Sequence, residues 1–189
     1  MIHSPRFVAV LDACVLYPAP IRDLLLHLAA LDLYTPKWTD RIQEEWTRSL
    51  LINRPDLSRQ QLQRIPEAMN SSFPDSSVEQ YESLIAAVAL PDPDDRHIVA
   101  AAIRCHADVI VTANLKDFPK ECLSQFDVEA QHPDYFISNL IDLNAGKALQ
   151  AFENQVACLR NPPKTKAEVL GNLEKVGLAV TCTKLLELI

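Results

Sequence analysis

Four acidic side chains occupy positions from which a folded α/β protein could bring them together, and the first is Asp12. It directly follows the apolar run Phe7–Leu11, which is typical of a strand buried on both faces of a parallel sheet. In open α/β sheets, ligands bind beyond the carboxyl ends of the strands. We therefore expect Asp12 to face such a crevice, and the alternative is an aspartate that only caps a turn.

Helical geometry separates the next two candidates, the adjacent residues Glu44 and Glu45. Thr39 is a suitable N-cap for a helix, and Ile42 and Trp46 mark the buried face of that helix. At about 100° per residue, Glu45 borders the buried face whereas Glu44 points to water. Glu45 is the candidate site residue, and the alternative is a solvated residue at the flank of the helix.

Three carboxylates within four residues precede a helix that is apolar nearly all round, from Ile98 to His106. One of Asp92, Asp94 and Asp95 can cap this helix, since acids suit a helix N-terminus. Three exceed what capping needs, and like charges so close repel each other unless a cation lies among them. Continuing the helix backwards places Asp95 on its buried face.

A second buried strand, Asp108–Thr112, ends in another polar cluster. Thr112, Asn114 and Asp117 follow its apolar residues. In a parallel sheet this strand end opens onto the same crevice as Asp12, so Asp117 would add a charge there while Thr112 and Asn114 add neutral hydrogen-bonding groups. The alternative is a polar turn capped by Asp117.

Together the four acids Asp12, Glu45, Asp95 and Asp117 predict a metal site. Four carboxylates in one pocket repel each other unless divalent cations neutralise them. Oxygen ligands without histidine or cysteine favour Mg²⁺ or Mn²⁺ over Zn²⁺. Metal-assisted hydrolysis of a phosphodiester is the chemistry that such a site supports.

Composition excludes several other classes of function. The chain has 189 residues and only three glycines, all at or beyond Gly146, which removes every glycine-rich phosphate loop. Five cysteines are scattered without metal-ligand spacing. A net charge of −7 excludes a generally basic surface but still allows RNA to bind a local basic patch or bound cations. With no apolar run near 18 residues and no signal peptide, we expect a cytoplasmic protein without a membrane span.

The order of elements predicts an α/β fold with a parallel central sheet, followed by helices. Residues 5–130 would form the first unit, and residues 131–189 a helical C-terminal extension. Three helices are expected in this extension, from Tyr135 to Asp142, from Ala145 to Leu159 and from Lys166 to Val176. Their apolar faces cannot remain in water, so we expect them to pack on the core of the first unit.

At this point the acidic residues and their neighbours resemble a known family, the PIN domain. The segments that carry the resemblance are Val-Leu-Asp12-Ala-Cys-Val-Leu, Trp-Thr-Asp-Arg-Ile-Gln-Glu-Glu45-Trp, Leu-Pro-Asp-Pro-Asp-Asp95-Arg-His-Ile-Val-Ala-Ala-Ala and Val-Ile-Val-Thr112-Ala-Asn114-Leu-Lys-Asp117-Phe-Pro. The resemblance implies a Rossmann-like, three-layer α/β/α ribonuclease that depends on Mg²⁺ or Mn²⁺. Its partners would be an RNA substrate and, as in VapC-type toxins of type II toxin-antitoxin systems, a cognate antitoxin protein; a homodimer stays open. The tail with Leu-Arg-Asn-Pro-Pro is similar to the C-terminal extension of one VapC-like subgroup.

The resemblance also implies roles for individual residues. One ion held by Asp12, Asp95 and Asp117 would bind the scissile phosphate and acidify the attacking water, while Glu45 would bind a second ion or orient that water. Thr112 and Asn114 would position phosphate or water by hydrogen bonds. Candidates for contacts with the RNA phosphates, although each could equally be solvated surface charge, are Arg96 and Lys116.

One position departs from the family pattern and keeps other functions open. The usual fourth acid lies two residues after the strand-terminal threonine, where this chain has Asn114, and Asp117 would take its place. This departure and the negative net charge favour an alternative, a catalytically silent PIN-like protein that binds RNA or a protein partner without cleavage. A phosphotransfer enzyme with Asp12 as nucleophile is a third reading, weakened because no second aspartate follows two residues later.

Overall fold

A parallel sheet with the strand order β2-β1-β3-β4 lies at the centre of the chain, and the computed structural model describes residues 7–189. Its strands are β1 (Val8–Leu11), β2 (Thr35–Lys37), β3 (Val109–Val111) and β4 (Glu129–Gln131). Residues 1–6 lie outside the described residues. They include the segment in which we predicted no signal peptide and the first two positions of the expected 5–130 unit.

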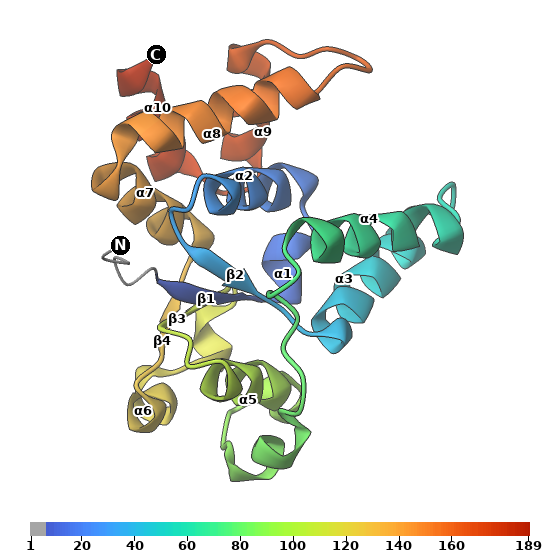
Figure 1. Ribbon diagram of the computed structural model, residues 1–189, viewed down its shortest axis with the longest axis vertical. Helices are drawn as coiled ribbons and strands as arrows, with labels where there is room; N and C mark the ends of the chain where they lie inside the picture. The colour runs from blue at the N-terminus through green and yellow to red at the C-terminus, as the bar shows by residue number, and fades with distance from the viewer. Residues whose placement is uncertain (1–6) are drawn as a thin grey trace.

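Helices cover both faces of the sheet, which confirms the predicted three-layer α/β/α architecture. The helices of the first unit are α1 (Ala13–Leu16), α2 (Ala19–Ala30), α3 (Asp40–Asn53), α4 (Arg59–Ser72), α5 (Arg96–Arg104) and α6 (Lys120–Leu123). Figure 1 shows α2 above the sheet and α5 and α6 below it, while α3 and α4 project to one side. Short 3₁₀ helices occur at Glu82–Ala87 (η1), Pro93–Asp95 (η2), Leu115–Asp117 (η3) and Ser124–Phe126 (η4).

The central strands β1 and β3 are apolar because both faces are covered. Ala9–Leu11 and Ile110–Val111 have no exposed surface, as expected for parallel strands between two helical layers. Leu11 pairs with Val111 in register. The residues that follow these two strands therefore emerge side by side at the same edge of the sheet.

The C-terminal extension packs on the first unit, as its apolar faces predict. It consists of α7 (Pro133–Leu143), α8 (Ala145–Cys158), α9 (Lys166–Lys175) and α10 (Ala179–Leu188). Helix α8 lies along α2 on the outer side of the upper layer (Figure 1), and Phe152 of α8 is fully buried within the main hydrophobic core. Burial of one such ring stabilises the packed state by about 1.5–3 kcal/mol. Among the helices of residues 7–189, none combines the length and apolarity that crossing a bilayer requires.

Two elements differ from what the sequence pattern predicts. Strand β2 holds only three residues and contains Pro36, which is tolerated because β2 is an edge strand. Helix α10 begins without a cap of its own, and the carboxylate of Asp134 in α7 accepts hydrogen bonds from the backbone nitrogens of Val180 (2.9 Å) and Thr181 (2.8 Å) instead. A cap supplied from 46 residues away leaves no local signal for the start of a helix.

Candidate active site

The candidate site lies where β1 and β3 end, at the point where the strand order reverses. From β1 the chain crosses to β2 on one side and later to β3 on the other, and open α/β sheets bind ligands at such a switch point. The backbone nitrogen of Asp12 donates to the carbonyl oxygen of Val111 (3.1 Å), which ties the two strand ends together. Asp12 and Thr112 thus become neighbours although 100 residues separate them.

Asp12 is a buried carboxylate with one oxygen held by the protein. Its side chain accepts hydrogen bonds at Oδ2 from Thr112 Oγ1 (2.7 Å) and from Cys14 Sγ (3.0 Å). Burial, together with the charge of Asp12, raises the pKa of the Cys14 thiol to about 12, so the thiol stays protonated and donates. Both bonds end on Oδ2, and no side chain or backbone group within residues 7–189 donates to Oδ1. A cation approaching Asp12 would meet this second oxygen.

The three aspartates of the acidic loop before α5 differ in their contacts and in their exposure to solvent. Asp92 caps the short 3₁₀ helix η2, because its Oδ1 accepts from the backbone nitrogen of Asp94 (2.8 Å). The predicted side-chain cap of α5 itself was wrong, since Asp95 precedes α5 without such a bond. Asp94 is exposed, whereas Asp95 is half-buried. Burial raises the pKa of Asp95 to about 6, and the negative charges of Asp12, Asp92 and Asp117 add to this effect. Asp95 therefore lies within the electric field of the other acids.

The loop after β3 brings Asn114 and Asp117 to the same place. The backbone nitrogen of Asn114 donates to Thr112 Oγ1 (3.0 Å), and the Asn114 side-chain amide donates to the carboxylate of Asp117. Through Thr112 this loop is linked to the carboxylate of Asp12. Asn114 therefore orients Asp117, and the replacement of the family's usual fourth acid by Asp117 stays a prediction.

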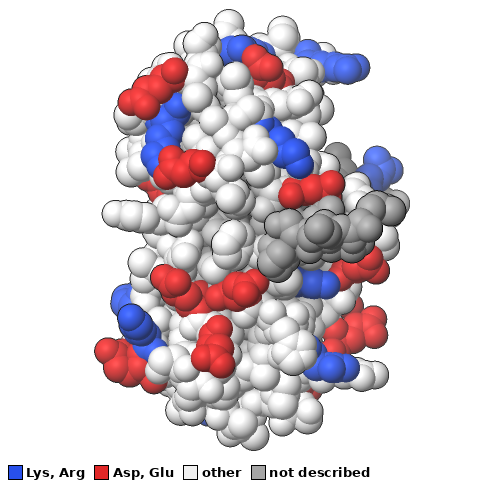
Figure 2. All heavy atoms as spheres, turned by 60° about the vertical axis from the view of Figure 1, so that its left-hand side comes forward, with Lys and Arg blue, Asp and Glu red and all other residues white. Residues whose placement is uncertain are grey.

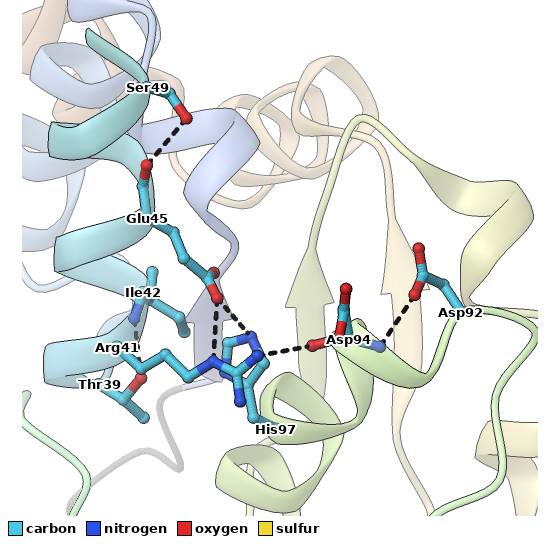
Figure 3. A network of polar contacts seen from close by, with 8 residues as sticks. All are labelled: Thr39, Arg41, Ile42, Glu45, Ser49, Asp92, Asp94 and His97. Carbon is cyan, nitrogen blue, oxygen red and sulfur yellow. Dashed lines mark hydrogen bonds and ion pairs between the residues drawn. The ribbon is translucent and has the colours of Figure 1, made fainter. Parts of the chain in front are cut away.

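Glu45 is held on the other side of the acidic loop, in a contact network that Figure 3 shows. Its Oε1 accepts from Arg41 Nε (3.0 Å) and lies 3.2 Å from His97 Nε2. Burial alone would raise the pKa of Glu45, but the hydrogen bonds and charges of His97 and Arg41 outweigh it, and the net pKa is lowered. Glu44 is exposed while Glu45 is half-buried, as the helical spacing predicts. The contacts of Glu45 do not join it to Asp12, Asp95 or Asp117 directly.

The two cationic residues beside the acids lie in different environments. Arg96 is half-buried at the start of α5, and its Nε is buried without a hydrogen-bond partner in the part of the chain that the structure describes. Lys116 is exposed in the loop after β3. Both remain predicted phosphate contacts.

The donor atoms of the acidic residues are of the type that a hard divalent cation binds, although they are not arranged around one point. Asp12, Asp95 and Asp117 offer carboxylate oxygens, the ligands that Mg²⁺ and Mn²⁺ prefer. Burial, and after it the charges of Asp12, Asp92 and Asp117, raise the pKa of Asp95, and a cation among these acids would relieve their repulsion. Within residues 7–189, however, no three His, Cys, Asp or Glu side chains lie close enough to ligate one ion.

Three residues of the site were not predicted as members of it. Cys14 looks like an incidental thiol by its lack of metal-ligand spacing, and His97 looks like a histidine at the edge of the core. Arg41 lies one turn before Glu45, and this i,i+4 spacing is the one local signal that could have indicated the pair. The contacts of Cys14 with Thr112, and of His97 with Glu45, join segments that are remote in sequence.

Two known protein families match different parts of the chain. The family described as PIN domain matches residues 8–116, and the family described as VapC50 C-terminal domain matches residues 133–187. The first match covers more than half of the chain, and the chain belongs to the PIN domain family. The resemblance seen in the sequence, including its C-terminal extension, is thereby confirmed.

A curated relative from Mycobacterium tuberculosis (strain ATCC 25618 / H37Rv) carries the name "Putative ribonuclease VapC50". It is 39% identical to this chain over 93 residues, which cover 49% of this chain and 54% of the relative. The match thus spans about half the length of each protein. No solved structure matches the chain significantly.

Proposed function

We propose that this protein is a metal-dependent endoribonuclease that hydrolyses RNA phosphodiester bonds. The observation that carries the proposal is the buried carboxylate of Asp12 at the β1/β3 switch point, with Asp95 close enough for its pKa to be raised. A protein rarely keeps like charges together at a sheet edge unless they bind something positive. Membership in the PIN domain family and the ribonuclease name of the relative support the same conclusion.

In this proposal, the residues of the chain bind the ion, the water and the phosphate. Asp12, Asp95 and Asp117 would hold Mg²⁺ or Mn²⁺, and Glu45 would bind a second ion or orient the attacking water. The ion supplies positive charge at the scissile phosphate and makes a nearby water more acidic. Thr112, which already donates to Asp12, keeps that carboxylate in place.

Neutral and basic groups around the acids would position the RNA. Asn114 would orient phosphate or water through its side chain, and Arg96 and Lys116 would contact phosphates next to the cut. On the face that Figure 2 shows, Lys and Arg side chains stand apart from one another among Asp, Glu and wide uncharged areas. Because the chain has a net charge of −7, contacts at individual phosphates and at the bound ion, rather than a broad basic surface, would provide the affinity for RNA.

The wider assignment is a VapC-type toxin that a cognate antitoxin neutralises. We propose residues 5–130 as the nuclease domain and residues 131–189 as the helical extension. The matches to a PIN domain and to a VapC50 C-terminal domain support this division. An antitoxin that binds this chain should abolish its RNA cleavage at equimolar concentration.

The test is induction of the protein in cells, followed by sequencing of RNA 5′ ends. We expect growth arrest and new ends at a small set of positions, and an Asp12→Asn variant made in equal amount should give neither. The alternative, a silent PIN-like protein, predicts RNA or protein capture by crosslinking without new ends. Equal patterns of ends from wild type and Asp12→Asn would refute the proposed function.

A further inference from the structure

Three residues from two elements form a contact network beside the candidate site, with Glu45 at its centre. Arg41 and Glu45 lie one turn apart on α3, and His97 lies in the first turn of α5. Arg41 Nη2 also donates to the backbone carbonyl oxygen of Asp94 (3.3 Å), as Figure 3 shows. The network therefore joins the helix that carries Glu45 to the loop that carries Asp95.

Both donors of this network end on the same oxygen of Glu45. Arg41 and His97 contact Oε1, and no group within residues 7–189 donates to Oε2. Asp12 shows the same division, with Thr112 and Cys14 on Oδ2. When protein donors fix one oxygen of a carboxylate, its plane is oriented and the other oxygen stays available to a ligand, which is how outer partners orient metal-binding side chains.

Burial of His97 lowers the stability of the fold more than burial of an apolar side chain of similar size would. Its side chain is 1% exposed, and its Nδ1 is buried without a hydrogen-bond partner in the described part of the chain. A buried polar atom without a partner destabilises the fold, whereas leucine would fill the same helical position without one. Leucine is also the better helix former. Packing alone therefore does not account for an imidazole here, whereas its contact with Glu45 does.

We propose that His97 is a positioning residue, which together with Arg41 fixes the Glu45 carboxylate so that its free oxygen serves the metal site. This inference rests on the proposed function, because it assumes that Glu45 acts at that site. Of the two partners, His97 contributes more, since Arg41 is 44% exposed and its ion pair is screened by water.

The test is a double-mutant cycle on the full chain, with the variants His97→Leu and Glu45→Gln and their combination. A fourth variant, His97→Gln, is the matched control. Gln keeps an N–H that can donate to Glu45, and Leu keeps the volume without the donor. Three quantities are measured for each protein: the affinity for Mn²⁺ alone by titration calorimetry, the rate of RNA cleavage at saturating Mn²⁺, and the melting temperature. Should His97→Leu fail to fold, His97→Met takes its place.

We expect His97→Leu to lose about 10-fold in Mn²⁺ affinity and in cleavage rate, the usual effect of removing an outer partner. Its melting temperature should stay close to that of the wild type, because removal of the unpaired Nδ1 offsets the lost contact with Glu45. His97→Gln should stay within about threefold of wild type, and the double variant should match Glu45→Gln alone, because His97 acts through Glu45. Losses that multiply in the double variant, or a His97→Gln as impaired as His97→Leu, would overturn the inference. A wild type that binds Mn²⁺ but cuts no RNA would refute the proposed function, and the affinity cycle would still decide the role of His97. A wild type that binds no Mn²⁺ would overturn both.

Discussion

Replacing Asp95 with asparagine should stabilise the metal-free protein, and the gain should depend on pH. Burial and the neighbouring acids raise the pKa of Asp95 from its ordinary value of 3.8 to about 6. Below pH 3.8 the carboxyl is protonated whether the chain is folded or not, so its ionisation then leaves stability unchanged. Between pH 3.8 and about 6 the unfolded chain ionises first, and stability falls as pH rises; above pH 6 the deficit is constant. Asparagine removes this deficit.

The size of the gain follows from the shift. A change of about two pKa units corresponds to about 3 kcal/mol, but Asp95 is only half-buried, so screening by water reduces this to about 1 kcal/mol. For a domain of this size, that equals an increase in melting temperature of about 2–4 °C. We expect this gain at pH 7.5 and almost none at pH 4, in melting curves recorded with a chelator.

The matched control is Asp94→Asn, which removes the same charge one residue earlier from an exposed side chain. It should give no gain that depends on pH. Added Mn²⁺ should reverse the order, because it stabilises the wild type, which keeps the ligand, more than Asp95→Asn. An equal gain for Asp95→Asn at both pH values, or the same gain for Asp94→Asn, would refute the crowding of acids around Asp95.

Three further predictions follow from single contacts. Glu45→Gln should lower Mn²⁺-dependent RNA cleavage at least 10-fold while Glu44→Gln leaves it unchanged, because only Glu45 is held toward α5; equal rates for the two variants would place Glu45 outside the site. Cys14 should react with iodoacetamide at pH 8 far more slowly than the exposed Cys158, because the raised pKa of Cys14 keeps it a thiol. Mass spectrometry of the native protein measures both rates, and comparable rates would contradict the bond of Cys14 to Asp12. Phe152→Ala should lower the free energy of unfolding by about 3–5 kcal/mol in urea titrations, and a loss below about 1 kcal/mol would show that α8 is only loosely packed.

Local patterns were sufficient to predict most of the fold. Thr39 caps α3 through a hydrogen bond from the Ile42 nitrogen (3.1 Å), as its position before the helical repeat predicts. The two apolar runs predicted as parallel strands are β1 and β3, and they are buried because helices cover both faces. The helix expected from Lys166 to Val176 is α9, and Gly177, which follows it, has a positive φ of 94°, a conformation that glycine adopts easily.

What the sequence could not provide lies in contacts between distant segments. Strand β2 is stable only as an edge beside β1, and α10 depends on a cap from Asp134, so neither has a strong local pattern. The same holds for the site. Its acids follow strand ends and helix faces and could be predicted, but the donors that orient them, Cys14 and His97, acquire their roles only through tertiary packing.

The most direct test of a metal-dependent site between β1 and β3 is the rate of RNA cleavage by the purified chain. It is measured with Mn²⁺ and with a chelator, for the wild type and for Asp12→Asn. Asparagine keeps the shape of the buried Asp12 side chain at the end of β1 and removes its ionisable carboxyl group. We expect the chelator to stop cleavage, and the variant to fold normally but cleave at least 100-fold more slowly. Cleavage that persists in the chelator, or that Asp12→Asn retains in full, would contradict a metal-dependent site between β1 and β3.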